Sequence, residues 1–166
     1  MIHPVQRVIQ EGGFELAPLL AELHAAASEP LQEVWDENAF FSLLSMNGVR
    51  AFVAGRRLTF DGDWSAEPGA FALFRATPPE AEVILVATAR DCRRQGLAWT
   101  LLRHAHREME KRSVEEVFLE VASDNRAAIA LYERLGYRRV GLRKGYYARP
   151  IRAVDAWTMR LDLLST

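Results

Sequence analysis

Residues 119–137, LEVASDNRAAIALYERLGY, combine the end of a strand, a turn and a short helix. The apolar run Val117–Val121 is typical of a buried strand, and it carries one carboxylate, Glu120. Residues 127–135 form a short helical segment, and Gly136 follows at the position where a left-handed glycine commonly ends a helix. This strand–helix unit predicts a sheet with helices packed against it.

The same alternation extends in both directions along the chain. Leu97, Leu101, Ala105 and Met109 recur every four residues, which predicts an amphipathic helix. The other segments expected to be strands are short apolar runs, near 7–10, 50–57, 69–76, 82–88, 137–142 and 155–161.

Two helices are expected in the first third of the chain. Residues 16–27 have helical spacing, and Asp36 is placed to cap a second helix that stops at Asn47-Gly48. The order β-α-α-β-β-β-α-β-α-β-β predicts a mixed α/β sheet in a single domain, 1–166. The connection 58–68 is expected to be a loop, either a gate for a substrate or a solvated insertion.

Composition excludes several classes of protein. The chain has 21 basic and 22 acidic residues among 166, and this balance argues against nucleic-acid or anionic-membrane binding. No apolar run approaches the ~20 residues that span a bilayer, and no secretion signal is visible, so we expect a cytoplasmic protein. The single Cys92 cannot form an internal disulfide, and the histidines and cysteine do not have zinc-site spacing, so we expect no metal site.

A candidate anion site lies in RRQGLA, residues 93–98, before the amphipathic helix. A helix start offers unpaired N–H groups and a partial positive charge. Gly96 and Ala98 leave the main chain open, and Arg90, Arg93 and Arg94 add positive charge. The motif is neither a Walker loop nor the dinucleotide motif GxGxxG, and from six residues alone it is also compatible with an ordinary loop.

Glu120 and Tyr132 are candidate catalytic groups. A carboxylate on a buried strand needs solvent, an ion pair or a chemical role, because burial without a partner is costly. Tyr132 lies on the following helix and is, taken alone, equally consistent with an aromatic core residue. Reference pKa values of about 4.3 for Glu and 10 for Tyr suit a base and an acid in one reaction.

These segments in this order resemble the GCN5-related N-acetyltransferase (GNAT) family, and within it the bacterial ribosomal-protein-alanine N-acetyltransferases of the RimI type. The matching text is RRQGLA, LEVASDNRAAIALYERLGY, GLRKGYY (141–147) and DAWTM (155–159). RRQGLA fits the family signature Q/R-x-x-G-x-G/A. The resemblance covers about residues 82–161 and implies a GNAT-like, mostly antiparallel sheet flanked by helices, with acetyl-CoA as co-substrate.

The resemblance also implies roles for individual residues. Glu120 would be the general base and Tyr132 the general acid, and Tyr146 and Tyr147 would border the acceptor. The residues implied in binding acetyl-CoA are Val86, Ala87, Thr88, Arg93, Arg94, Gln95, Gly96, Leu97, Ala98, Trp99 and Asn125. This sequence has Thr88 where the family usually has valine, and Ala98 where glycine is commoner; both changes spare backbone contacts.

The predicted activity is acetyl transfer from acetyl-CoA to the α-amino group of a protein or peptide N-terminus. Acetylation of a lysine or a small amine is an alternative, and a non-catalytic acetyl-CoA-binding module is another. The expected partners are acetyl-CoA and the acceptor, and the protein is expected to be a monomer or homodimer.

Overall fold

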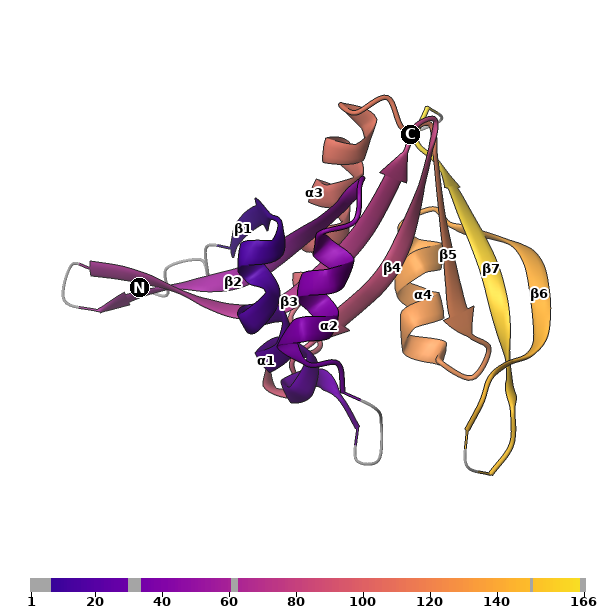
Figure 1. The fold of residues 1–166 in the computed structure, drawn as a ribbon, viewed down its shortest axis with the longest axis horizontal. Helices are drawn as coiled ribbons and strands as arrows, with labels where there is room; N and C mark the ends of the chain where they lie inside the picture. Colours follow the sequence, from indigo (N-terminus) through magenta and orange to yellow (C-terminus); the bar gives the residue numbers. More distant parts are fainter. Residues whose placement is uncertain (1–6, 30–33, 61–62, 150, 165–166) are drawn as a thin grey trace. The chain divides into compact units, whose positions relative to one another are not determined.

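The computed structural model describes residues 7–29, 34–60, 63–149 and 151–164 (Figure 1). The described elements follow the order expected from the sequence. The strands are β1 (Arg7–Gly12), β2 (Val49–Phe60), β3 (Asp63–Thr77), β4 (Glu80–Thr88), β5 (Glu116–Ala122), β6 (Arg138–Tyr147) and β7 (Val154–Asp162). The α-helices are α1 (Ala17–Ala27), α2 (Glu37–Leu44), α3 (Leu97–Glu110) and α4 (Arg126–Arg134), and two 3-10 turns are η1 (Phe14–Leu16) and η2 (Arg90–Cys92).

The strands form a seven-stranded sheet of order β1-β2-β3-β4-β5-β7-β6. Neighbours are antiparallel in β1–β2, β2–β3, β5–β7 and β6–β7, whereas β4 and β5 are parallel from Glu80↔Glu116 to Val83↔Leu119. The predicted fold class, a mixed and mostly antiparallel sheet with helices, is confirmed. The chain divides into two compact units, and the expectation of a single domain over 1–166 remains a prediction.

The N-terminal unit contains residues up to 75 and residues 84–105. In it, α1 and α2 pack against β2 and β3 around a core that includes Leu20, Phe40, Val53 and Phe71. Asp36 caps α2 by accepting a hydrogen bond of 2.8 Å from the Ala39 amide, as the sequence predicts.

The predicted loop 58–68 is wrong, because both arms of this connection are strand. β2 continues to Phe60 and β3 begins at Asp63, with Phe60 paired to Asp63. Pro68 reads as a turn in the sequence but lies opposite Gly55, beside a β-bulge, where a ladder can hold a proline. A Cβ on Gly55 would lie 2.6 Å from the Glu67 carbonyl oxygen, so glycine permits this close approach.

The C-terminal unit contains residues 76–83 and the chain from 106 onward. Its core includes Val117, Leu119, Ile129 and Met159, which are all nearly inaccessible to solvent. Gly136 follows α4 with φ +98°, as the predicted helix end requires. β6 runs to Tyr147, beyond the predicted end at 142, because pairing with β7 holds a strand whose side chains are mostly exposed.

Candidate active site

The turn before α3, residues 93–96, belongs to the N-terminal unit. Arg94 and Gly96 have positive φ values of 62° and 75°. The Thr100 amide donates to the Gly96 carbonyl oxygen at 3.1 Å, so the N–H groups of residues 97–99 have no acceptor within the helix. Backbone amides in such a turn form a concave site for an anion, and the helix dipole adds to it. The turn therefore fits a phosphate group.

Buried neighbouring side chains and one residue of β1 fix the position of this turn. Cys92 and Leu97 are buried, and a Cβ on Gly69 would lie 2.7 Å from the Cys92 sulfur. Arg7 donates to the Gln95 carbonyl oxygen at 2.7 Å and to the Thr100 hydroxyl at 2.8 Å. These contacts fix the backbone of the turn while its outer surface stays exposed, and Cys92 packs beneath it.

Arg93 contacts the end of α1. Its guanidinium donates to the Ala27 carbonyl oxygen at 2.6 Å and to a Glu29 carboxylate oxygen at 3.0 Å, and its Nε donates to the Thr88 carbonyl oxygen at 3.3 Å. The hydrogen bond from Arg93 lowers the pKa of Glu29. Arg93 thus joins the last residue of β4 to a helix C-terminus, where a cation is favourable. A contact with pyrophosphate stays a prediction for this residue.

The other residues implied in co-substrate binding lie as follows. Val86, Ala87 and Thr88 are half-buried at the end of β4, and Trp99 stacks with the Arg103 guanidinium 4.7 Å from its ring centre. Asn125 caps α4 by accepting from the Ala128 amide at 3.2 Å. The cap is a structural role that the sequence reading of Asn125 did not include.

Glu120 lies on β5 in the C-terminal unit, with 23% of its side chain exposed. Arg143 donates to its carboxylate at 2.6 Å, and the phenol of Tyr146 also donates a hydrogen bond to that carboxylate, which raises the Tyr146 pKa. The Tyr147 hydroxyl donates to the Glu120 carbonyl oxygen at 3.3 Å. The carboxylate is therefore ion-paired, accessible and surrounded by polar groups.

Tyr132 lies on α4 and is buried. Burial and the neighbouring Tyr147 raise its pKa well above the ordinary value of 10, so the phenol stays protonated at neutral pH. Burial is the main cause that raises the pKa of Tyr147, and the nearby charge of Glu120 raises it further. Tyr147 therefore has both Glu120 and Tyr132 as electrostatic neighbours, and the structure brings the predicted base, the predicted acid and the two predicted acceptor-side tyrosines into one cluster.

Sequence reasoning missed two interactions of this unit. Nothing in the local sequence pairs Arg143 with Glu120, because the two residues lie 23 positions apart on different strands. His106, two residues after His104 on α3, has its Nε2 2.8 Å from the Tyr137 hydroxyl, and the side chains of His106 and Tyr137 are buried. The i, i+2 spacing of the histidines shows only that they do not face each other.

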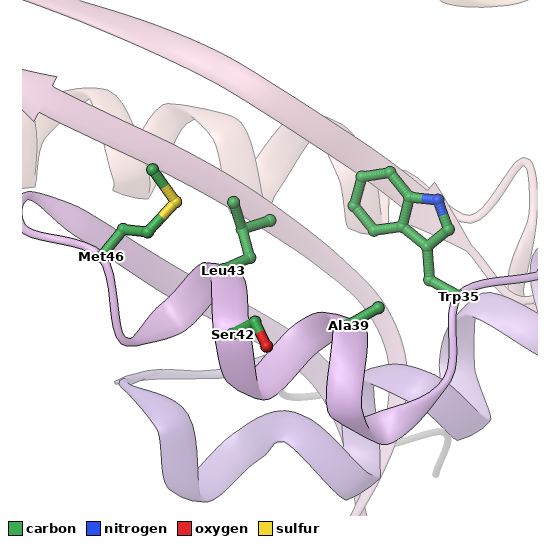
Figure 2. A pocket seen from close by; sticks show the side chains of 5 residues that line it. All are labelled: Trp35, Ala39, Ser42, Leu43 and Met46. Carbon is green, nitrogen blue, oxygen red and sulfur yellow. The ribbon is translucent and has the colours of Figure 1, made fainter.

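A hollow of about 330 Å³ lies along α2 in the N-terminal unit. Figure 2 shows the side chains that line it, Trp35, Ala39, Ser42, Leu43 and Met46. Ala39, Ser42 and Leu43 share one face of α2, whereas Trp35 and Met46 lie just before and just after the helix. The lining has no titratable group, so this hollow suits an apolar chain and not proton transfer.

No described helix has the length and hydropathy needed to cross a membrane. Within the described ranges, no three His, Cys, Asp or Glu side chains are grouped as a metal site would require.

Comparison with known proteins extends these observations. The model of the Acetyltransferase (GNAT) family matches residues 15–137. A [ribosomal protein bS18]-alanine N-acetyltransferase of Escherichia coli K12 is 39% identical over 108 residues, which cover 65% of this chain and 73% of that protein. The crystal structure of the ribosomal-protein-S18-alanine N-acetyltransferase from Escherichia coli superposes with TM-score 0.79 and 31% sequence identity. The match covers 95% of this chain and 94% of the E. coli chain. Arabidopsis thaliana NAA60 in complex with acetyl-CoA shares the fold, with TM-score 0.75 and 16% identity over 95% of this chain and 98% of that chain.

Proposed function

The chain belongs to the acetyltransferase (GNAT) family, and we propose that it transfers an acetyl group from acetyl-CoA to the α-amino group of a protein or peptide N-terminus. The acceptor proposed is of the ribosomal-protein-alanine type, as the names of the E. coli relatives suggest. The observation that carries the proposal is the cluster of an accessible carboxylate, Glu120, and a protonated phenol, Tyr132, around Tyr147.

Acetyl-CoA would supply the activated acetyl thioester. We assign its pyrophosphate to the backbone of Arg94–Trp99, because a helix start directs its N–H groups and its positive dipole end toward an anion and Gly96 has no side chain to block the approach. The backbone of Val86, Ala87 and Thr88 is assigned to the pantetheine arm and the acetyl carbonyl, which an N–H group there would polarise. Asn125 is assigned a contact with the same co-substrate.

Two side chains would move protons. Glu120 accepts a proton from the acceptor ammonium, through a water molecule, so that the amine nitrogen can form the new C–N bond. As the C–S bond breaks, Tyr132 donates its phenolic proton to the leaving thiolate, and the second proton lost by the amine nitrogen passes through water to reprotonate Tyr132. Because burial raises the pKa of Tyr132, its phenol is protonated at neutral pH and carries a proton to donate. No serine or cysteine nucleophile is needed.

The α-amine suits this arrangement better than a lysine side chain. Its reference pKa of about 7.7–8.0 is some 2.5 units below that of lysine, so at pH 7 it is several hundred-fold richer in free base. A water-relayed carboxylate is then sufficient to complete its deprotonation. Tyr146 and Tyr147 are assigned to the acceptor, and Tyr146, 44% exposed, offers an aromatic contact surface.

The setting proposed for this reaction is the cytoplasm, where ribosomal proteins are made. The near-neutral charge favours a protein acceptor over nucleic acid or an anionic membrane as partner. A monomer or a homodimer is compatible with the proposed chemistry.

The acceptor is tested with two peptides of the same sequence that begin with alanine and contain an internal lysine. One has a free N-terminus and the other is chemically acetylated there. We expect the protein to release coenzyme A thiol and to acetylate only the free peptide, at its α-amine, as located by tandem mass spectrometry. Transfer to the blocked peptide would support the lysine alternative, and acetyl-CoA binding without thiol release would support a non-catalytic module.

A further inference from the structure

Arg143 contacts two side chains of the candidate active site, Glu120 and Tyr146. Its Nη1 lies 2.6 Å from Glu120 Oε1, and its guanidinium carbon lies 4.1 Å from the centre of the Tyr146 ring. The hydrogen bond to Glu120 raises the pKa of Arg143. Ring stacking and a short charge-assisted hydrogen bond together define one geometry for this guanidinium.

An irregular stretch of β6 orients Arg143 and Tyr146. The register of β6 against β7 shifts between Arg143 and Tyr147, which is a β-bulge. Within the bulge Gly145 has φ +61°, and its amide donates to the Asp155 carboxylate at 2.8 Å. A bulge redirects neighbouring side chains, so Arg143 and Tyr146 both reach the Glu120 carboxylate.

We propose that Arg143 is a positioning residue for the base: it holds one oxygen of the Glu120 carboxylate so that the other oxygen is presented to the acceptor's proton. The inference rests on the proposed function, in which Glu120 is that base. The guanidinium makes its contacts to Glu120 and Tyr146 and takes up no proton in the reaction. Arg149 does not duplicate this role, because it pairs with Asp124 at 2.7 Å.

The same strand offers a matched control. Arg139 forms an ion pair of 2.7 Å with Glu133 and stacks 5.0 Å from the Trp157 ring centre. This is the same chemistry on the same strand, with a different carboxylate. An isolated surface ion pair contributes little to stability, so Arg139→Gln and Arg143→Gln are expected to melt at similar temperatures.

The experiment measures kcat and both KM values for Arg143→Gln, Arg143→Lys and Arg139→Gln with acetyl-CoA and an alanine-terminated peptide. We expect Arg143→Gln to lower kcat ~10-fold or more, because a misdirected catalytic group is costly, with both KM values within about twofold of the wild type. Arg143→Lys keeps the charge and recovers part of kcat, and Arg139→Gln behaves as wild type. In a Glu120→Gln background, Arg143→Gln causes no further loss.

Three results would overturn the inference: wild-type kcat in Arg143→Gln, equal losses in Arg143→Gln and Arg139→Gln, or a loss confined to KM. The Glu120→Gln enzyme separates this failure from that of the proposed function. If Glu120→Gln loses turnover while Arg143→Gln retains it, only the positioning role is wrong. If Glu120→Gln retains full turnover, the assignment of the base itself is wrong.

Discussion

The burial of His106, whose Nε2 lies 2.8 Å from the Tyr137 hydroxyl, makes the stability of the protein depend on pH. Both side chains are almost fully buried, and burial lowers the pKa of His106 from 6.5 to about 4. The folded chain therefore binds this proton only near pH 4, whereas the unfolded chain binds it near pH 6.5. As pH falls below 6.5 the unfolded state takes up the proton first, so the contribution is complete above pH 6.5 and is lost towards pH 4.

The size of the effect follows from the shift. A change from 6.5 to about 4 corresponds to about 3 kcal/mol in full, at roughly 1.4 kcal/mol per pKa unit. Between pH 7.5 and pH 5 the free energy of unfolding should fall by about 2 kcal/mol through His106 alone. At pH 5 His106 is mostly protonated in the unfolded chain but still mostly neutral in the folded chain.

Denaturant unfolding of wild type and His106→Leu at pH 7.5 and pH 5 measures this contribution. At pH 7.5 the variant should be less stable by about 1–3 kcal/mol, because the Tyr137 hydroxyl loses its partner. Its further loss on going to pH 5 should be about 2 kcal/mol smaller than that of wild type. The double variant with Tyr137→Phe removes both polar groups and should recover part of the stability. Equal losses in wild type and His106→Leu between the two pH values would refute the reasoning; His24, whose pKa burial also lowers, contributes equally to both.

Two further predictions concern the co-substrate residues. Gly96→Ala places a Cβ at φ +75° and should cost about 1–2 kcal/mol of stability while raising the KM for acetyl-CoA; an unchanged KM would argue against phosphate binding at the turn. Asn125→Ala should lose about 1 kcal/mol because the α4 cap is removed, whereas Asn125→Asp keeps the cap. If Asn125 also contacts acetyl-CoA, both variants raise the KM for acetyl-CoA. If both variants keep the wild-type KM and only Asn125→Ala melts at a lower temperature, Asn125 acts as a helix cap alone.

Local signals in the sequence predicted most of the fold. The four-residue spacing of Leu97, Leu101, Ala105 and Met109 predicted the buried face of α3. Residues at this spacing lie on one side of a helix, and all four are buried in the structure. Asp36 and Gly136 marked helix ends because capping needs only neighbouring residues. By contrast, Pro68 indicated a turn inside β3, since the bulge opposite it depends on a strand partner that the local sequence does not reveal.

The candidate site was predictable only in part. Glu120 and Tyr132 were found as a chemical pair with the help of the family resemblance, and the structure adds Tyr147 beside both. The Arg143–Glu120 ion pair joins residues on β6 and β5, which are separated in the sheet order by β7, and depends on a register shift. The His106–Tyr137 hydrogen bond likewise depends on tertiary packing, which residue spacing alone does not specify.

The central claim is that Glu120 takes the proton of the acceptor amine. Its most direct test is the rate of thiol release at saturating acetyl-CoA and alanine-terminated peptide, for wild type and Glu120→Gln. The claim predicts a fall in kcat of about 100-fold or more, with the KM for acetyl-CoA nearly unchanged. Turnover of Glu120→Gln at the wild-type rate would contradict it.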